Sequence, residues 1–122
     1  MAEWVNADVV ERRLIEGGWL TPDTYNDSFA PLTSGPAVYL FALFSREAFY
    51  ESCVVAYVGM STKLKQRLSQ HEILDELDRP DWWVKRWFLP TRRESLMQEK
   101  RKLIAAYDPP WNIVGRKKGF VS

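Results

Sequence analysis

The sequence predicts an α/β domain of the α+β type, built on a small three-stranded antiparallel sheet with flanking helices. Two runs, residues 37–44 and 53–59, are rich in the Val, Tyr, Phe and Leu side chains that strands favour. A third run of this kind, WWVKRWFLP, ends at Pro90. Apolar residues at helical spacing follow both the second run and the third. These observations give the element order β-β-α-β-α.

Each predicted helix has its own start and stop signals. The first lies within STKLKQRLSQHEILDEL, begins at a Ser-Thr capping candidate and ends before a turn at residues 78–81. The second lies within RRESLMQEKRKLIAAY and is stopped by Pro109-Pro110. Its apolar stripe consists of Leu96, Leu103, Ile104 and Tyr107.

An N-terminal extension, residues 1–34, is expected ahead of the domain at residues 35–122. Residues 7–16 predict a short helix that Gly17-Gly18 ends, and an ordered connection follows it. The helix carries an apolar face made of Val9, Val10, Leu14 and Ile15. We expect this face to pack on the chain's own sheet, with a homodimer contact as the alternative.

Length and composition bound the class of protein. The 122 residues suffice for one domain. Cys53 is the only cysteine, so neither an intramolecular disulfide nor a cysteine-based zinc site is available, and a reducing compartment is expected. No apolar run approaches about 18 residues and no signal-like segment opens the chain, which predicts a cytoplasmic protein without a membrane span.

Charge is distributed unevenly along the chain. Residues 1–81 carry seven Lys or Arg against thirteen Asp or Glu, whereas residues 82–122 carry ten against three. The basic third could meet phosphates, or the two parts could neutralise each other across one surface. The side chains that could follow a DNA backbone are Lys85, Arg86, Arg92, Arg93, Lys100, Arg101, Lys102, Arg116, Lys117 and Lys118.

Arg67 and His71 form the first candidate for chemistry. They lie four residues apart on the first helix of the domain and therefore share a face. A guanidinium is suited to binding a phosphate, and an imidazole beside it can orient or exchange a proton. Alone, this spacing is also typical of a solvated helix face. The pair follows Tyr39 and Tyr57-Val58-Gly59, which lie on the first two predicted strands.

In this order the motifs resemble the GIY-YIG nuclease family over residues 35–115. AVY stands where the family has GIY, YVG stands where it has YIG, and RLSQH supplies the family's arginine and histidine. LIAAYDPPWN is similar to the closing Pro-x-x-Asn segment. The resemblance implies a metal-dependent endonuclease that hydrolyses phosphodiester bonds in DNA, cutting one strand per active site.

The resemblance also implies a role for each site residue. Tyr39 would act as general base and Tyr57 would position water or phosphate. Arg67 would bind the scissile phosphate and offset its growing charge, and His71 would orient the tyrosine or the water. Glu99 would hold one Mg²⁺ or Mn²⁺, because hard cations prefer carboxylate and water ligands.

Five further residues belong to the implied site on its substrate-binding side: Gly59, Ser61, Lys63, Lys65 and Asn112. The two lysines are candidates for the cation that a phenolate needs nearby. Asn112 would hydrogen-bond backbone or phosphate and fix the end of the second helix. An ordinary turn asparagine is the alternative.

The metal ligand leaves two alternatives open. Counted back from Asn112, the family's glutamate position falls on Lys100, one residue after Glu99, and one residue turns a helical side chain by about 100°. Either the turn before Asn112 absorbs a residue and Glu99 holds the ion, or the domain is a catalytically inactive module that binds DNA or a protein partner. An RNA-acting enzyme is a third, weaker alternative.

Overall fold

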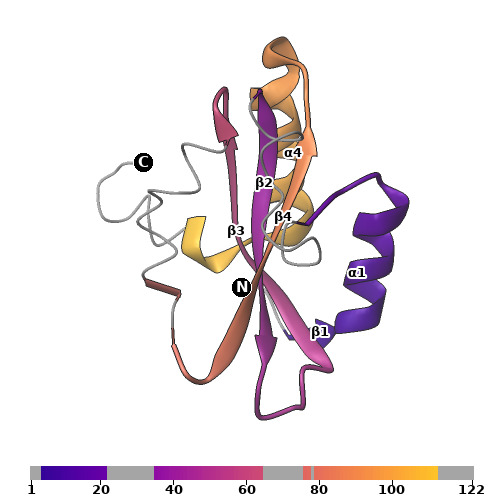
Figure 1. The fold of residues 1–122 in the computed structure, drawn as a ribbon, viewed down its shortest axis with the longest axis vertical. Coiled ribbons are helices and arrows are strands. Elements are labelled where there is room, and N and C mark those ends of the chain that lie inside the picture. The colour runs from indigo at the N-terminus through magenta and orange to yellow at the C-terminus, as the bar shows by residue number, and fades with distance from the viewer. Residues whose placement is uncertain (1–3, 22–34, 65–75, 78, 113–122) are drawn as a thin grey trace.

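The computed structural model describes residues 4–21, 35–64, 76–77 and 79–112. Its elements are β1 (Val5–Asn6), α1 (Ala7–Glu16), β2 (Ala37–Ser45), β3 (Ser52–Ser61), β4 (Trp82–Pro90), the 3-10 turn η2 (Arg93–Ser95) and α4 (Leu96–Tyr107). In Figure 1, α1 lies beside the sheet and α4 runs behind it. Both helices cover the same face of the sheet, because α1 and α4 pack into one apolar cluster.

The sheet has four antiparallel strands in the order β1-β3-β2-β4. The predicted α+β class and antiparallel pairing are confirmed, but the prediction of three strands is wrong. The additional strand, β1, places Val5 opposite Cys53 and Asn6 opposite Ser52. Two residues are too few to display the period-two alternation that identifies a strand in a sequence.

Of the two helices predicted for the domain, the second is observed as α4, with η2 before it. The first was predicted within residues 61–77 and falls largely outside the described residues, of which Leu64, Glu76 and Leu77 are helical. The β-β-α-β-α order as a whole therefore stays a prediction. Among the described helices, none combines the length and apolar character needed to cross a bilayer.

β2 is the centre of the fold. It pairs with β3 on one side and β4 on the other, and its residues are buried from Ala37 to Phe44. Alternate side chains enter two separate apolar clusters, as the pleat of a strand requires. Val38 and Leu40 point to the face that α1 and α4 cover, called the helix face below. Tyr39 and Phe41 point to the opposite face, called the tyrosine face.

The ends of α1 lie where the sequence predicts them. Asn6 begins the helix, since its Oδ1 accepts a hydrogen bond from the Val9 amide at 3.2 Å. Gly17 ends it, and its backbone amide donates hydrogen bonds to the carbonyl oxygens of Arg13 and Ile15. Gly18 follows at a φ of 86°, in the left-handed region that glycine adopts without strain.

The apolar face predicted for α1 is only partly correct. Ala7, Val10 and Leu14 are buried in the helix face, whereas Val9 and Ile15 are 45% and 64% exposed. Positions spaced three and four apart share one side of a helix, and the residue before or after them is rotated by about 100°. A narrow stripe therefore docks on the sheet, and Val9 and Ile15 lie on its two flanks.

Cys53 lies at the start of β3 and is fully buried in the helix face. Burial, together with the smaller effect of the negative charge of Glu11, raises the pKa of its thiol from 9.0 to about 11. Between pH 9 and pH 11 the unfolded chain loses the thiol proton that the folded chain keeps. The free energy of unfolding should therefore fall with rising pH in this window, by about 1.4 kcal/mol per pH unit.

Urea denaturation at pH 8 and pH 10.5 measures this effect, with Cys53→Ala as the control because it removes the titrating thiol. Other groups titrate in the same range and contribute equally to both proteins. The wild-type protein should lose more stability than the variant between the two pH values. An equal loss in both proteins would contradict a raised pKa of Cys53.

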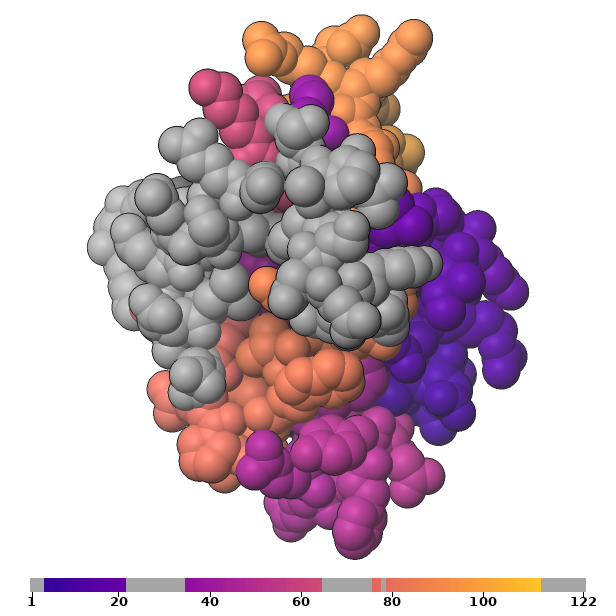
Figure 2. Space-filling view, in the orientation of Figure 1, coloured from indigo at the N-terminus to yellow at the C-terminus, as the bar shows by residue number. Residues whose placement is uncertain are grey.

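The loop between β2 and β3, residues 46–51, occupies one end of the molecule beside the first residues of β4 (Figure 2). The amide of Arg46 donates to the carbonyl oxygen of Asp81 at 3.1 Å, and the amide of Ala48 donates to Ser45 Oγ at 3.3 Å. The first bond attaches the loop to the turn that precedes β4, and the second attaches it to the end of β2.

Candidate functional site

The two predicted site tyrosines lie close together on the tyrosine face. The ring centroids of Tyr39 and Tyr57 are 6.3 Å apart. The Phe41 ring is in contact with both, at 5.5 Å from Tyr39 and 5.8 Å from Tyr57. Two residues that are distant in the sequence thus meet on adjacent antiparallel strands, as the AVY and YVG motifs predict.

A β-bulge sets the direction of Tyr57. Phe41 is opposite Tyr57, but the next residue of β2, Ala42, is opposite Val55, so Ala56 is an extra residue in β3. A bulge of this kind shifts the alternation of side chains by one position. Ala56 and Tyr57 accordingly both belong to the apolar cluster of the tyrosine face. Without the extra residue, Tyr57 and Val54 could not share that face.

The requirement for glycine at position 59 is explained by Tyr39, which lies opposite it on the neighbouring strand. A Cβ atom added to Gly59 would lie 2.5 Å from the Tyr39 hydroxyl oxygen and 2.8 Å from Tyr39 Cε2. Real Cβ atoms do not approach other atoms so closely. The glycine of the YVG motif therefore leaves the space in which the Tyr39 ring lies.

The two phenols differ in exposure. Tyr39 is 1% exposed, whereas Tyr57 is half-buried. Tyr57 is near the surface, whereas Tyr39 is enclosed on the same face of the sheet, opposite Gly59. A group that exchanges a proton with a water molecule needs access to that water, and exposure therefore favours Tyr57.

Asn112 binds the backbone of β3 next to Tyr57. Its Oδ1 accepts a hydrogen bond from the Val58 amide, and its Nδ2 donates to the Val58 carbonyl oxygen, both at 2.8 Å. β1 covers β3 only at Ser52 and Cys53, so Val58 lies on an edge of β3 that the asparagine amide satisfies. Of the two predicted partners of Asn112, backbone or phosphate, the structure has the backbone.

The turn before Asn112 carries the chain from one face of the sheet to the other. Leu103 and Ile104 of α4 pack against the helix face, and Trp111 packs against the tyrosine face. Asp108 ends α4 in the left-handed region, with a φ of 46° and its amide donating to Ile104 O. The segment thereby wraps around the edge of β3.

The helix that carries Glu99 packs on the face of the sheet opposite the tyrosine rings. α4 packs its stripe on the helix face, and the Glu99 carboxylate lies 3.3 Å from the ammonium of Lys102. Lys100, the alternative position of the family's glutamate, is half-buried. Within the ranges that the structure describes, no three His, Cys, Asp or Glu side chains gather to hold a metal ion.

No family model matches the chain, and neither does any curated protein or solved structure. The GIY-YIG resemblance therefore depends on the quoted motifs and on the geometry of the tyrosine face.

The remaining predicted site residues fall into two groups. Ser61 ends β3, and its Oγ accepts a hydrogen bond from the Lys63 amide at 3.0 Å, which turns the chain toward Leu64. Lys65, Arg67 and His71 lie outside the described residues.

The position of Arg86 could have been predicted from the sequence, but was not. Phe41 of β2 is opposite Tyr57 on one side and opposite Arg86 of β4 on the other. The half-buried Arg86 therefore belongs to the row that contains Tyr57, about 10 Å away across two strand spacings. Counting alternate residues back from Phe88, which packs on the tyrosine face, is the signal that places it there.

Proposed function

We propose that this protein is an endonuclease that hydrolyses phosphodiester bonds in DNA, with its active site on the tyrosine face. The observation that supports the proposal is that Tyr39, Tyr57 and Gly59 lie together on one face, with Asn112 hydrogen-bonded to the adjacent backbone of Val58. A bare hairpin needs neither the tyrosines at these positions nor a glycine opposite one of them. The GIY-YIG resemblance gives this arrangement a chemical purpose.

In this proposal Tyr57 takes the proton of the attacking water, because it is the more exposed of the two phenols. The Tyr39 ring packs beside that of Tyr57, with 6.3 Å between their centroids, and helps to orient it. A phenol has an ordinary pKa of about 10, so a neighbouring cation is required to favour the phenolate at neutral pH. Arg67 is assigned to the scissile phosphate, and Arg86 is a second guanidinium in the row of Tyr57.

The Mg²⁺ or Mn²⁺ that the resemblance implies finds one candidate ligand, Glu99. One carboxylate can suffice for an ion that keeps water and substrate oxygens as its other ligands. Here, however, the carboxylate is beside Lys102 and its helix packs on the opposite face of the sheet. The described donors therefore do not fit the ion, and the roles given above to Tyr57 and Tyr39 depend on the chain's own residues.

The poor fit of these residues to a divalent ion favours a second function. Lys100 in the position of the family's glutamate is a cation where a divalent ion would need an anion. A domain of this kind would bind DNA, or a protein partner, without cutting. Its affinity for DNA would fall with salt, because phosphate contacts release counterions.

A nicking assay on supercoiled and branched DNA at low salt, with Mg²⁺, Mn²⁺ or a chelator, separates the two functions. Tyr57→Phe removes only the hydroxyl and should lower the cleavage rate by about 100-fold or more. Tyr50→Phe, on the loop at the far end of β3, should change it less than about twofold. Glu99→Ala and Arg67→Ala test the ion and the phosphate contact.

The outcomes are distinct. Cleavage lost in Tyr57→Phe and Arg67→Ala, and kept in Tyr50→Phe, supports the nuclease. Salt-sensitive DNA binding without cleavage on any substrate would replace it with the binding module. Cleavage that survives in Tyr57→Phe would remove the proposed base.

A further inference from the structure

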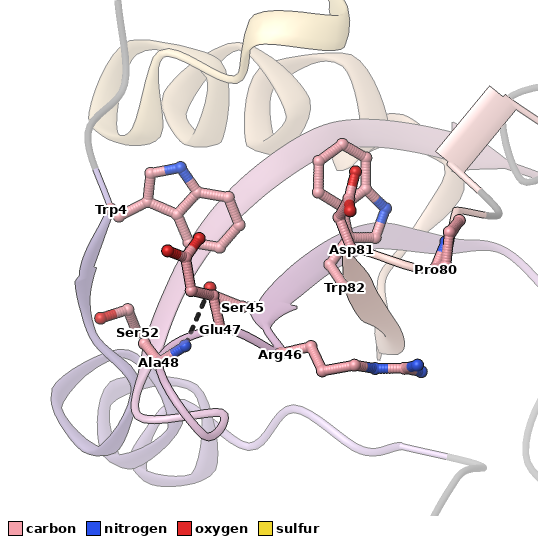
Figure 3. A pocket seen from close by; sticks show the side chains of 9 residues that line it. All are labelled: Trp4, Ser45, Arg46, Glu47, Ala48, Ser52, Pro80, Asp81 and Trp82. Carbon is pink, nitrogen blue, oxygen red and sulfur yellow. Dashed lines mark hydrogen bonds between the residues drawn. The ribbon is translucent and has the colours of Figure 1, made fainter.

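A pocket of about 810 Å³ lies at the end of the sheet where the β2–β3 loop meets the start of β4. Its walls include two indoles, Trp4 and Trp82, and two carboxylates, Glu47 and Asp81 (Figure 3). The rest of its lining consists of Ser45, Arg46, Ala48, Ser52 and Pro80. None of these residues takes part in the site on the tyrosine face.

The two indoles form a wedge. Their ring centroids are 6.4 Å apart and the ring planes are tilted by 40°. Trp82 is the fixed wall, because its Nε1 donates to Leu77 O at 2.5 Å and the Trp111 ring meets it edge-on at 6.1 Å. Trp4 is the outer wall and is 45% exposed. The tilt of the two rings opens the wedge on one side, where a flat group can lie against the indole faces.

The two carboxylates give the pocket a negative charge. Neither Glu47 nor Asp81 has an ion-pair partner in the part of the chain that the structure describes. Figure 3 shows both carboxylates among the side chains that line the pocket, and the Arg46 side chain extends away from Trp4. The bond between Arg46 N and Asp81 O holds the two sides of the pocket together.

We propose that this pocket, defined by Trp4, Trp82, Glu47 and Asp81, binds an arginine side chain of a partner polypeptide. A guanidinium is planar, stacks on aromatic faces and presents paired N–H donors to carboxylates. It therefore matches both the wedge and the charge. A lysine ammonium satisfies the charge but is not flat, and a nucleic acid would bring phosphates toward two carboxylates. The inference is independent of whether the tyrosine face cuts DNA.

The test is a titration of the full-length protein with acetyl-Gly-Arg-Gly-amide, followed by the NMR signals of the indole N–H groups. The matched probe is the same peptide with citrulline, which keeps the shape of arginine and lacks its charge. We expect saturable shifts of the Trp4 and Trp82 signals with the arginine peptide. The citrulline peptide should bind at least about tenfold more weakly, because the cation–π and ion-pair contacts are lost.

Variants locate the binding. Asp81→Asn keeps the shape of the side chain and should weaken binding about fivefold or more, and Trp4→Ala should do the same. Trp83→Ala is the control, since Trp83 is a similarly exposed tryptophan outside the pocket, at 44% exposed. Glu47→Gln is a second neutralisation in case Asp81→Asn perturbs the turn before β4.

Three results would overturn the proposal. The first is equal affinity for the arginine and citrulline peptides. The second is binding that both carboxylate variants leave unchanged. The third is a short oligonucleotide, offered in parallel, that shifts the Trp4 and Trp82 signals when the arginine peptide does not. The last result would make the pocket a base-stacking site.

Discussion

Gly59→Ala is expected to lower the free energy of unfolding by about 3 kcal/mol, at the upper end of the cost of overpacking a core. The new Cβ would lie 2.5 Å from the Tyr39 hydroxyl oxygen and 2.8 Å from Cε2. The Tyr39 ring has little room to retreat, because it is 1% exposed and in contact with Phe41 and Tyr57. For a domain of this size the midpoint of thermal unfolding should fall by about 10–15 °C.

The measurement is urea denaturation of Gly59→Ala, with Gly35→Ala as the matched control. A Cβ at Gly35 meets nothing within 4 Å, so the same substitution there should change stability by less than about 0.5 kcal/mol. Tyr39→Leu provides a second test, because it removes the ring atoms that the new Cβ would strike. In that background Gly59→Ala should cost about 1 kcal/mol or less.

A penalty for Gly59→Ala that stays the same without the Tyr39 ring would show that the glycine is needed for backbone reasons alone. A penalty that disappears would tie the two motifs, one on each strand of the hairpin, to one contact. Because the contact positions Tyr39 beside Tyr57, the variant should also lower any cleavage activity.

The sequence predicts the strands well and their partners only in part. β2 is recognisable because a central strand buried on both faces is a continuous apolar run, and Ala37 to Phe44 form one. The meeting of Tyr39 and Tyr57 follows from the order of the motifs. The bulge at Ala56 does not, because its sequence, VVAYV, contains no glycine or proline to mark it.

The candidate site was harder to predict than the fold, for geometric reasons. The sequence predicts Glu99 in the same site as Tyr39 and Tyr57, but it does not show which face of the sheet α4 covers. The packing of Leu103 and Ile104 decides that. The pocket of Trp4 and Trp82 was not predicted either, since Trp4 directly precedes β1, Trp82 begins β4, and β1 is too short to recognise in the sequence.

Asn112→Asp is expected to cost about 3 kcal/mol, although it exchanges one atom of similar size. The Asn112 amide accepts from the Val58 amide and donates to the Val58 carbonyl oxygen, both at 2.8 Å. A carboxylate can still accept, but it cannot donate, so one of its oxygens would face the carbonyl oxygen. The lost hydrogen bond and the repulsion between two acceptors in a partly buried site add to each other.

Asn6→Asp is the matched control, because it is the same substitution in a place where only an acceptor is used. Asn6 Oδ1 accepts from Val9 N at the start of α1, and aspartate caps a helix as well as asparagine does. Its negative charge at a helix N-terminus should leave stability unchanged or raise it slightly. Urea denaturation of both variants at pH 7 gives the comparison.

Protonation offers a second control for Asn112→Asp. At pH 3 the introduced carboxylic acid carries a proton and can donate to the Val58 carbonyl, so the gap in stability between the variant and the wild-type protein should narrow. Equal stability of Asn112→Asp and the wild-type protein at pH 7 would contradict the two-bond contact with Val58. A large loss confined to pH 7 would instead show that the edge of β3 beside Tyr57 is held by a donor as well as an acceptor, the feature that only an amide side chain supplies.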